Sequence, residues 1–137
     1  ISSIVISIII LVYILFGKRV RKYIKIRSLN KKLKKFTIKY EKQLSIYNSN
    51  KFKNELEKLL IIWKVYMEYI SNNPYLSSTT KEIEIFKKDI KIIKSLKEID
   101  RKIYSKENEG VELKDINYLY DEAKKAFNVK LYEIKNG

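Results

Sequence analysis

The chain opens with an unbroken apolar run. Residues 1–16 contain no charged side chain, and Gly17 separates them from the basic sequence KRVRKYIKIR. A membrane-spanning helix needs about 20 mainly apolar residues, so we expect residues 1–17 to be a transmembrane helix that is truncated at its N-terminal end. A cleavable signal peptide carries its basic residues before the apolar run and a small-residue cleavage site after it. The reversed order in this sequence favours a true span.

Three serines interrupt the apolar run and are candidates for packing within the membrane. Ser2, Ser3 and Ser7 are its smallest side chains, and small residues allow transmembrane helices to approach one another closely. We therefore expect the run to act as a contact surface for another membrane helix as well as an anchor.

Residues 18–48 predict a basic juxtamembrane helix. Twelve basic residues and one acidic residue lie between Lys18 and Lys42, which gives +11 of the chain's net charge of +14. By the positive-inside rule, we expect a single pass through the bacterial inner membrane with the C-terminal part in the cytoplasm. The basic residues nearest the span are candidates for contact with anionic lipid headgroups or with a partner: Lys18, Arg19, Arg21, Lys22, Lys25 and Arg27. A stop-transfer flank with a solvated helix face is the simpler interpretation of the same residues.

Apolar residues spaced by three and four positions predict helices in the rest of the chain. A first stripe runs from Ile26 to Tyr47, and its helix is expected to continue unbroken from the membrane. Residues 48–50, Asn-Ser-Asn, predict a turn, after which a second stripe runs from Phe52 to Ile70. Two such helices joined by a short turn are expected to form an antiparallel hairpin. Since the second helix is apolar on more than one face, we expect it at the centre of a bundle.

The second helix is expected to end before Pro74, because proline disfavours a helical conformation in the residue that precedes it. The sequence Thr79-Thr80-Lys81-Glu82 then predicts a capping box. In such a box, the Thr79 hydroxyl accepts from the Glu82 backbone N–H, while the Glu82 carboxylate accepts from the Thr79 backbone N–H. Another helix is therefore expected to follow Thr79.

A third apolar stripe follows this cap. It runs from Ile83 through Ile90 to Ile103 at helical spacing, which again predicts helix. The polar Lys88-Asp89 pair within it predicts a kink or turn, so we expect two helices here.

The C-terminal part predicts a loop and one more helix. Residues 107–110 include Gly110 and predict a loop. A final helix is expected over residues 113–127, and the helical pattern fades beyond Asn128. The predicted fold class is all-α: an N-terminal transmembrane helix, and a small helical bundle of four to five helices in a cytoplasmic domain over residues 49–137.

Composition argues against catalysis by this chain. The sequence contains no His and no Cys, which excludes Ser-His-Asp and Cys-His triads and metal sites built on those ligands. Its three glycines are too far apart to form a Gly-rich phosphate-binding loop. Acidic pairs such as Glu55 and Glu57 lie two positions apart, so on a helix they face different directions. We therefore predict a protein that is not an enzyme and that has no cofactor and no metal.

The aromatic residues Trp63, Tyr66 and Tyr69 allow two interpretations. Their spacing of three beside lysines is compatible with stacking on nucleobases. Trp63, however, lies within the apolar stripe of the second helix, which favours packing in the core. The basic residues are mostly Lys, and lysine lacks the forked guanidinium with which Arg reads bases bidentately, so we expect no specific nucleic-acid binding.

Four short motifs, taken in order with the span and the basic helix, resemble a known family. They are Leu59-Leu60 through Tyr66-Met67-Glu68, Thr79-Thr80-Lys81-Glu82, Asp100-Arg101-Lys102-Ile103-Tyr104, and residues 118–127. The family is a small membrane-anchored helical domain of unknown function, encoded beside MoxR-type AAA+ ATPases and von Willebrand factor A proteins in bacterial aerotolerance (Bat) operons. The resemblance covers nearly the whole chain. The Trp-Trp-Pro stretch that often precedes the membrane helix in this family does not occur in this sequence.

The resemblance implies an accessory role. Members of the family assemble at the inner membrane with von Willebrand factor A membrane proteins and a MoxR ATPase, and the metal and ATP sites would lie on those partners. We therefore expect a non-catalytic scaffold or adaptor subunit. Two alternatives stay open: a helical accessory subunit of another membrane complex, and a membrane-tethered, nonspecific nucleic-acid binder.

Overall fold

The computed structural model describes residues 1–106, 111 and 113–137. These residues form five helices and no strand, which confirms the all-α prediction. The helices are α1 (Ser2–Asn50), α2 (Lys53–Ser71), α3 (Thr80–Phe86), α4 (Ile90–Tyr104) and α5 (Leu113–Asn136). The loop predicted at residues 107–110 lies outside the described residues.

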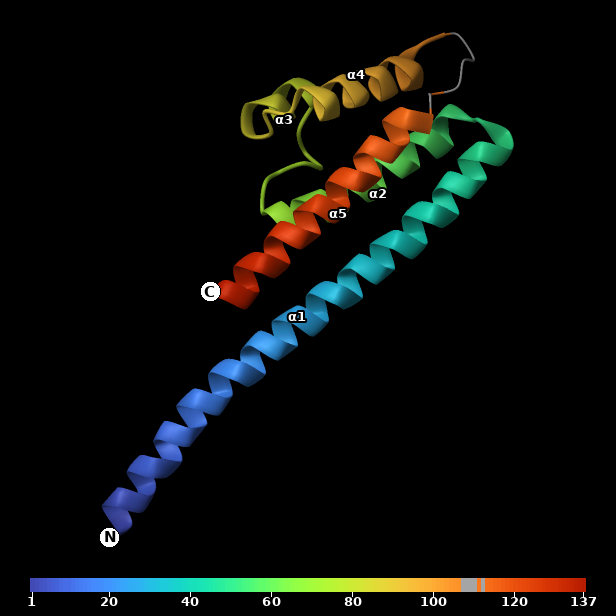
Figure 1. Cartoon of the computed structure of the whole chain (residues 1–137). Helices are drawn as coiled ribbons and strands as arrows, with labels where there is room; N and C mark the ends of the chain where they lie inside the picture. Colours follow the sequence, from blue (N-terminus) through green and yellow to red (C-terminus); the bar gives the residue numbers. More distant parts are fainter. Residues whose placement is uncertain (107–110, 112) are drawn as a thin grey trace.

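Helix α1 is a single rod of 49 residues that runs from the apolar N-terminus to Asn50. The sequence of this stretch contains no Pro and only one Gly, Gly17, so nothing in it forces a break. The first buried residue is Leu29, and Figure 1 shows the N-terminal part of α1 projecting away from the other helices. We call the packed part of the chain, from Leu29 to the end of α5, the head, and residues 18–28 the stalk.

The turn between α1 and α2 lies two residues later than predicted. α1 continues through residues 48–50, and its C-cap residue Lys51 adopts a left-handed conformation and donates its backbone N–H to Tyr47 O. Phe52 is then the extended N-cap of α2 and is 59% exposed, so its predicted place in the core is wrong. The physical reason is that Asn50 Oδ1 accepts from the Phe52 N–H and holds that residue outside both helices. The hairpin itself is present, because α2 runs back along the last part of α1 (Figure 1).

One apolar core joins all five helices, and α3 contributes the fully buried Ile83 to it. Trp63 of α2 is fully buried in it, as the stripe predicted, and its Nε1 donates to Leu119 O of α5 at 2.6 Å. Tyr40 of α1 is also buried and donates its hydroxyl to Ile116 O of α5 at 2.9 Å. α2 and α5 each pack against α1 and α4, so α2 shares the central position with α5. Ile61 on the outer face of α2 is exposed.

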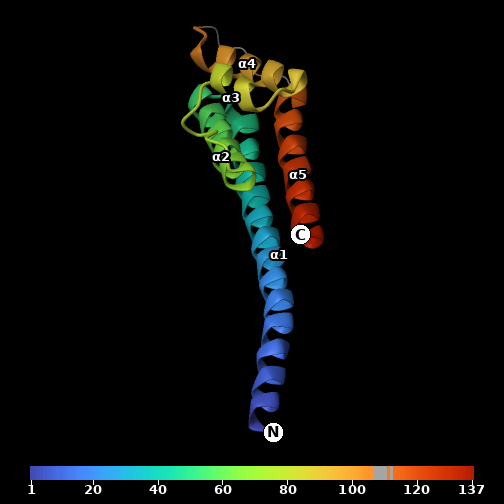
Figure 2. The ribbon, with the colours of Figure 1, turned by 90° about the vertical axis from the view of Figure 1, so that its left-hand side faces the viewer.

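Helices α3 and α4 close the end of the head that lies farthest from the N-terminus (Figure 2). The capping box is present: Thr79 Oγ1 accepts from the Glu82 N–H, and Glu82 Oε1 accepts from the Thr79 N–H. The predicted break near residue 88 is confirmed, since Asp89 Oδ1 caps a new helix, α4. Because this cap starts a separate helix axis, the stripe of α3 does not continue in phase. Ile90 is 87% exposed at the start of α4, so its predicted inward position is wrong.

Helix α5 is longer than the sequence predicted. It continues beyond Asn128 to Asn136, and Leu131 and Ile134 pack against the core from this extension. Near its C-terminal end, the Lys135 carbonyl accepts from Lys22 Nζ at 2.8 Å. The end of α5 therefore returns to the stalk, and Figure 2 shows the C-terminus beside α1.

Candidate functional site

The apolar run is exposed along its whole length. Residues 1–16 have no buried side chain, because no other part of the described chain covers them. Among the helices that the structure describes, α1 is the one that is long and apolar enough to cross a membrane. Ser7 Oγ donates to Ser3 O at 2.8 Å, so this hydroxyl needs no water partner. Ser3 and Ser7 lie one turn apart on one face beside Ile4, whereas Ser2 lies outside this group.

The basic residues of the stalk do not form one surface. Lys18, Arg21, Lys22 and Lys25 are spaced as i, i+3, i+4 and i+7, which places them on one side of an α-helix. This side includes Lys22, whose ammonium meets the end of α5. Arg19 and Arg27 complete the six residues singled out from the sequence, and their positions place them on other sides of α1.

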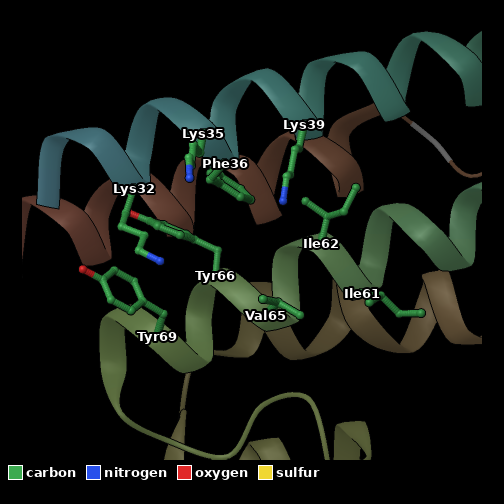
Figure 3. A pocket seen from close by; sticks show the side chains of 9 residues that line it. All are labelled: Lys32, Lys35, Phe36, Lys39, Ile61, Ile62, Val65, Tyr66 and Tyr69. Carbon is green, nitrogen blue, oxygen red and sulfur yellow. The ribbon is translucent and has the colours of Figure 1, made fainter. Parts of the chain in front are cut away.

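One concave feature that combines positive charge with apolar and aromatic surface is a groove between α1 and α2. Its volume is about 320 Å³, near the lower end of the range for ligand clefts. Three lysines of α1, Lys32, Lys35 and Lys39, line one side of it. The rest of the lining consists of apolar and aromatic side chains from both helices: Phe36, Ile61, Ile62, Val65, Tyr66 and Tyr69. Figure 3 shows the three lysines reaching from α1 towards α2.

Two aromatic contacts organise the groove. The rings of Phe36 and Tyr66 stack at a centroid distance of 4.3 Å and an interplanar angle of 13°. Lys32 Nζ lies 5.3 Å from the centroid of the Tyr69 ring, within the range of a cation–π interaction. Burial, and secondarily Tyr69, raises the pKa of Tyr66 to about 12, so this phenol stays protonated near neutral pH.

The Tyr66 hydroxyl is buried without a hydrogen-bond partner. It is the one such side-chain atom among the described residues. Figure 3 shows the hydroxyl pointing towards α1, on the side where Lys32 and Lys35 leave that helix. A buried polar group without a partner costs about 1–3 kcal/mol, so an acceptor supplied at this atom would be stabilising.

Two buried carboxylates of α5 pair with side chains from neighbouring segments. Ser95 Oγ of α4 donates to Asp115 Oδ1 of α5 at 3.0 Å. Lys87 forms an ion pair with the buried Glu122 of α5. The first pair joins α4 to α5, the second joins α5 to the residue that follows α3, and neither lies in the groove.

Two of the motifs that carry the family resemblance contact each other. Thr80 Oγ1, from the Thr-Thr-Lys-Glu motif, donates to Asp100 Oδ2 of the Asp-to-Tyr motif. Trp63 lies between Leu60 and Tyr66, and it bonds to Leu119 of the fourth motif. These residues therefore act in the fold. Trp63 and Tyr66 are also too deeply buried to stack on nucleobases, which leaves Tyr69 as the exposed ring of that series.

The groove was missed by sequence reasoning. In the sequence analysis, Lys32, Lys35 and Lys39 were used only as part of the total charge of the basic stretch. The available signal was their i, i+3, i+7 spacing, together with Ile61, Val65 and Tyr69 at spacings of four on α2. Comparison with protein-family models, curated proteins and solved structures finds no significant match to this chain.

Proposed function

We propose that this chain is a non-catalytic adaptor subunit anchored in the bacterial inner membrane by a single span. The observation that carries the proposal is the exposed apolar run, which continues without a break into the folded head. An uninterrupted apolar helix surface of this length is stable when lipid covers it. The hydroxyl of Ser7, satisfied by Ser3 O, fits a segment that lies away from water.

The positive charge of the helix that follows the apolar run supports a cytoplasmic head. The excess of +11 between Lys18 and Lys42 immediately follows the apolar run, and cytoplasmic flanks carry such an excess. Lys18 and Arg19 directly follow the run, at the level of the headgroups. We assign them, with Arg21, Lys22 and Lys25, to contacts with anionic lipid.

The partners in the proposal come from the sequence resemblance. We assign the chain to an assembly of von Willebrand factor A membrane proteins and a MoxR ATPase, which would carry the metal and ATP sites. The role of this chain is then to hold partners at the membrane. An open groove with a charged rim suits that role, because it can bind a segment of another protein.

Affinity purification in a gentle detergent, followed by mass spectrometry, tests the partner assignment. We expect the full chain to recover von Willebrand factor A proteins together with a MoxR ATPase. Recovery of only secretory or respiratory subunits would contradict this assignment and favour an accessory subunit of another membrane complex. Recovery of nucleic acid that is lost as salt is raised to physiological levels would favour the nonspecific nucleic-acid binder.

Cysteine labelling in intact cells tests the topology. The chain has no native Cys, and Ser49 is exposed near the far end of α1, so Ser49→Cys provides a single reporter. We expect a membrane-impermeant thiol reagent to label it only after lysis. A cysteine in an N-terminal tag is the control and should be labelled in intact cells. Labelling of Ser49→Cys without lysis would contradict the proposed orientation and place the head outside the cytoplasm.

A further inference from the structure

The groove between α1 and α2 carries charge that nothing in the described chain neutralises. Lys32, Lys35 and Lys39 line it, and no carboxylate of the described residues lies in its wall or within ion-pair distance of these ammonium groups. The groove therefore presents a positive rim towards solvent.

Its apolar side is equally uncovered. Ile61, Val65 and Tyr69 follow one another at spacings of four along the outer face of α2, and each is 44–50% exposed. Tyr66 adds a buried hydroxyl with no acceptor at the inner edge of the groove. A ligand that suits all three features has an apolar face, several negative charges and a hydrogen-bond acceptor.

We propose that the groove binds an acidic amphipathic helical segment of a partner protein, an inference that rests on the adaptor function proposed above. The apolar face of the segment packs on Ile61, Val65 and Tyr69, and its carboxylates pair with the three lysines. The groove extends over residues 32–39 and 61–69, which correspond to about 10 and 12 Å of helix. Two turns of a docked helix fit this length, and helix-in-groove recognition uses apolar anchors at such spacings.

A lipid bilayer is a less suitable occupant because of distance. Lys32 lies sixteen residues beyond Phe16 on a continuous helix, which is about 24 Å. The Debye length in physiological salt is about 8 Å, so headgroups at the end of the apolar run do not attract these lysines. A nucleic acid is disfavoured because Tyr69 alone offers an exposed ring, whereas single strands bind to successive stacking residues.

The test uses the full chain in nanodiscs of zwitterionic lipid and a fluorescently labelled helical peptide with Glu on one face and Leu on the other. Fluorescence anisotropy measures its Kd. In the first variant, Lys32, Lys35 and Lys39 are all replaced by Gln, and the peptide should bind about tenfold more weakly or worse, since each exposed pair contributes up to about 1 kcal/mol. The matched control replaces Arg27, Lys31 and Lys34 by Gln, which removes the same charge from α1 outside the groove. Its Kd should change by about twofold or less.

Two further variants test the groove without changing the lysines. Val65→Glu places a negative charge on the apolar side at a half-exposed position, so the head should fold and peptide binding should be lost. Tyr66→Phe removes the buried hydroxyl that has no hydrogen-bond acceptor. It should weaken binding by about threefold to tenfold, while the thermal midpoint stays the same or rises. A hydroxyl with a purely structural role would give the opposite change in stability and no change in Kd.

Several outcomes would overturn the inference. These are equal weakening by both triple variants, equal affinity for a peptide with Lys in place of Glu, displacement of the peptide by anionic vesicles, and dimerisation of the chain through the groove. Membrane fractionation of the same protein distinguishes failure of the groove proposal from failure of the proposed membrane anchor. A chain that sits in membranes but does not bind the peptide refutes the groove alone. Lysine-dependent binding by a chain that does not enter membranes supports the groove and refutes the anchor.

Discussion

Two buried aromatic side chains place hydrogen-bond donors on backbone carbonyls of α5. Tyr40 reaches Ile116 O from α1, and Trp63 reaches Leu119 O from α2. A carbonyl oxygen has two lone pairs and accepts such a bond in addition to its helical one. Each ring thus fills the core with apolar area and also fixes the position of α5 along its neighbours.

Trp63→Ala should destabilise the head by about 3–5 kcal/mol, because it leaves a cavity in the core. The substitution also removes the hydrogen bond to Leu119 O. Denaturant unfolding of the full chain in detergent, followed by circular dichroism, measures the loss. Tyr69→Ala on the exposed face of the same helix is the control and should cost less than about 1 kcal/mol. An unchanged free energy of unfolding in Trp63→Ala would place this side chain outside the core.

We predict that the free energy of unfolding falls at alkaline pH because of the buried tyrosines. Burial raises the pKa of Tyr66 and of Tyr75 from 10.0 to about 12, with Tyr69 and Glu122 as the respective secondary causes. Because each pKa is higher in the folded state, the stabilisation is fully present below pH 10 and is lost as pH rises towards 12. Unfolding measured between pH 9 and about 12 should show this decline. The double variant Tyr66→Phe/Tyr75→Phe should show a shallower decline, and an equal slope would refute this cause.

At the level of elements, the short helix α3 depends on its first turn. α3 has seven residues, and helices of this length are unstable without tertiary contacts or caps. The Thr79 and Glu82 pair satisfies backbone donors at its start, while Thr80 ties it to Asp100 of α4. Local capping, this long-range hydrogen bond and the burial of Ile83 in the core together position α3.

Thr79→Ala should lower the free energy of unfolding by about 1 kcal/mol through loss of the cap. Thr79→Ser keeps the hydroxyl and should retain most of the stability. Thermal unfolding of the two variants beside the unchanged chain provides the measurement. A destabilisation in Thr79→Ser as large as in Thr79→Ala would mean that the methyl group, and not the cap, is responsible.

Helices and their order could be predicted from the sequence because apolar spacing and capping residues act locally. Turn positions were less accurate, since the Asn-rich residues 48–50 are compatible with helix as well as turn. Lys51 ends α1 in a left-handed conformation, which Asn and Gly adopt more readily than Lys. Beyond Asn128, Leu131 and Ile134 continue the stripe of Phe127, but only a few residues carried that signal.

The groove could not be predicted from either helix alone. On α1, Lys32, Lys35 and Lys39 appear as ordinary solvated lysines of a basic stretch. On α2, Ile61 appears as one of the extra apolar residues that predicted a central helix. The groove forms only when the two helices pack, because their packing angle and register bring the lysines of α1 beside the uncovered apolar side chains of α2.

At the scale of the whole molecule, the apolar run, the stalk and the head are arranged in line (Figure 1). The core begins at Leu29, so a replaced span changes no residue of the head. The end of α5 meets α1 at Lys22, also outside the apolar run. The apolar run and the folded core therefore share no residue.

Replacing residues 1–16 by an unrelated apolar span should leave the head folded and reduce the recovery of membrane partners several-fold. The reason is that transmembrane helices associate through close packing and not through hydrophobic transfer. Circular dichroism checks the fold, and quantitative mass spectrometry of the purified complex measures recovery. The narrower variant Ser3→Leu/Ser7→Leu tests the small-residue face by itself. Undiminished recovery in both variants would limit the run to anchoring.

The unbroken backbone of α1 also makes it a lever. From Phe16 to Asn50 the helix is about 50 Å long, and it has no Pro at which it can bend. In the proposed topology, a change of roughly 10° in the tilt of the span lies within the range seen for membrane helices. Such a change moves the far end of α1 sideways by about 9 Å. Bilayer thickness, or a neighbouring span that sets this tilt, would then decide where α3 and α4 stand above the membrane.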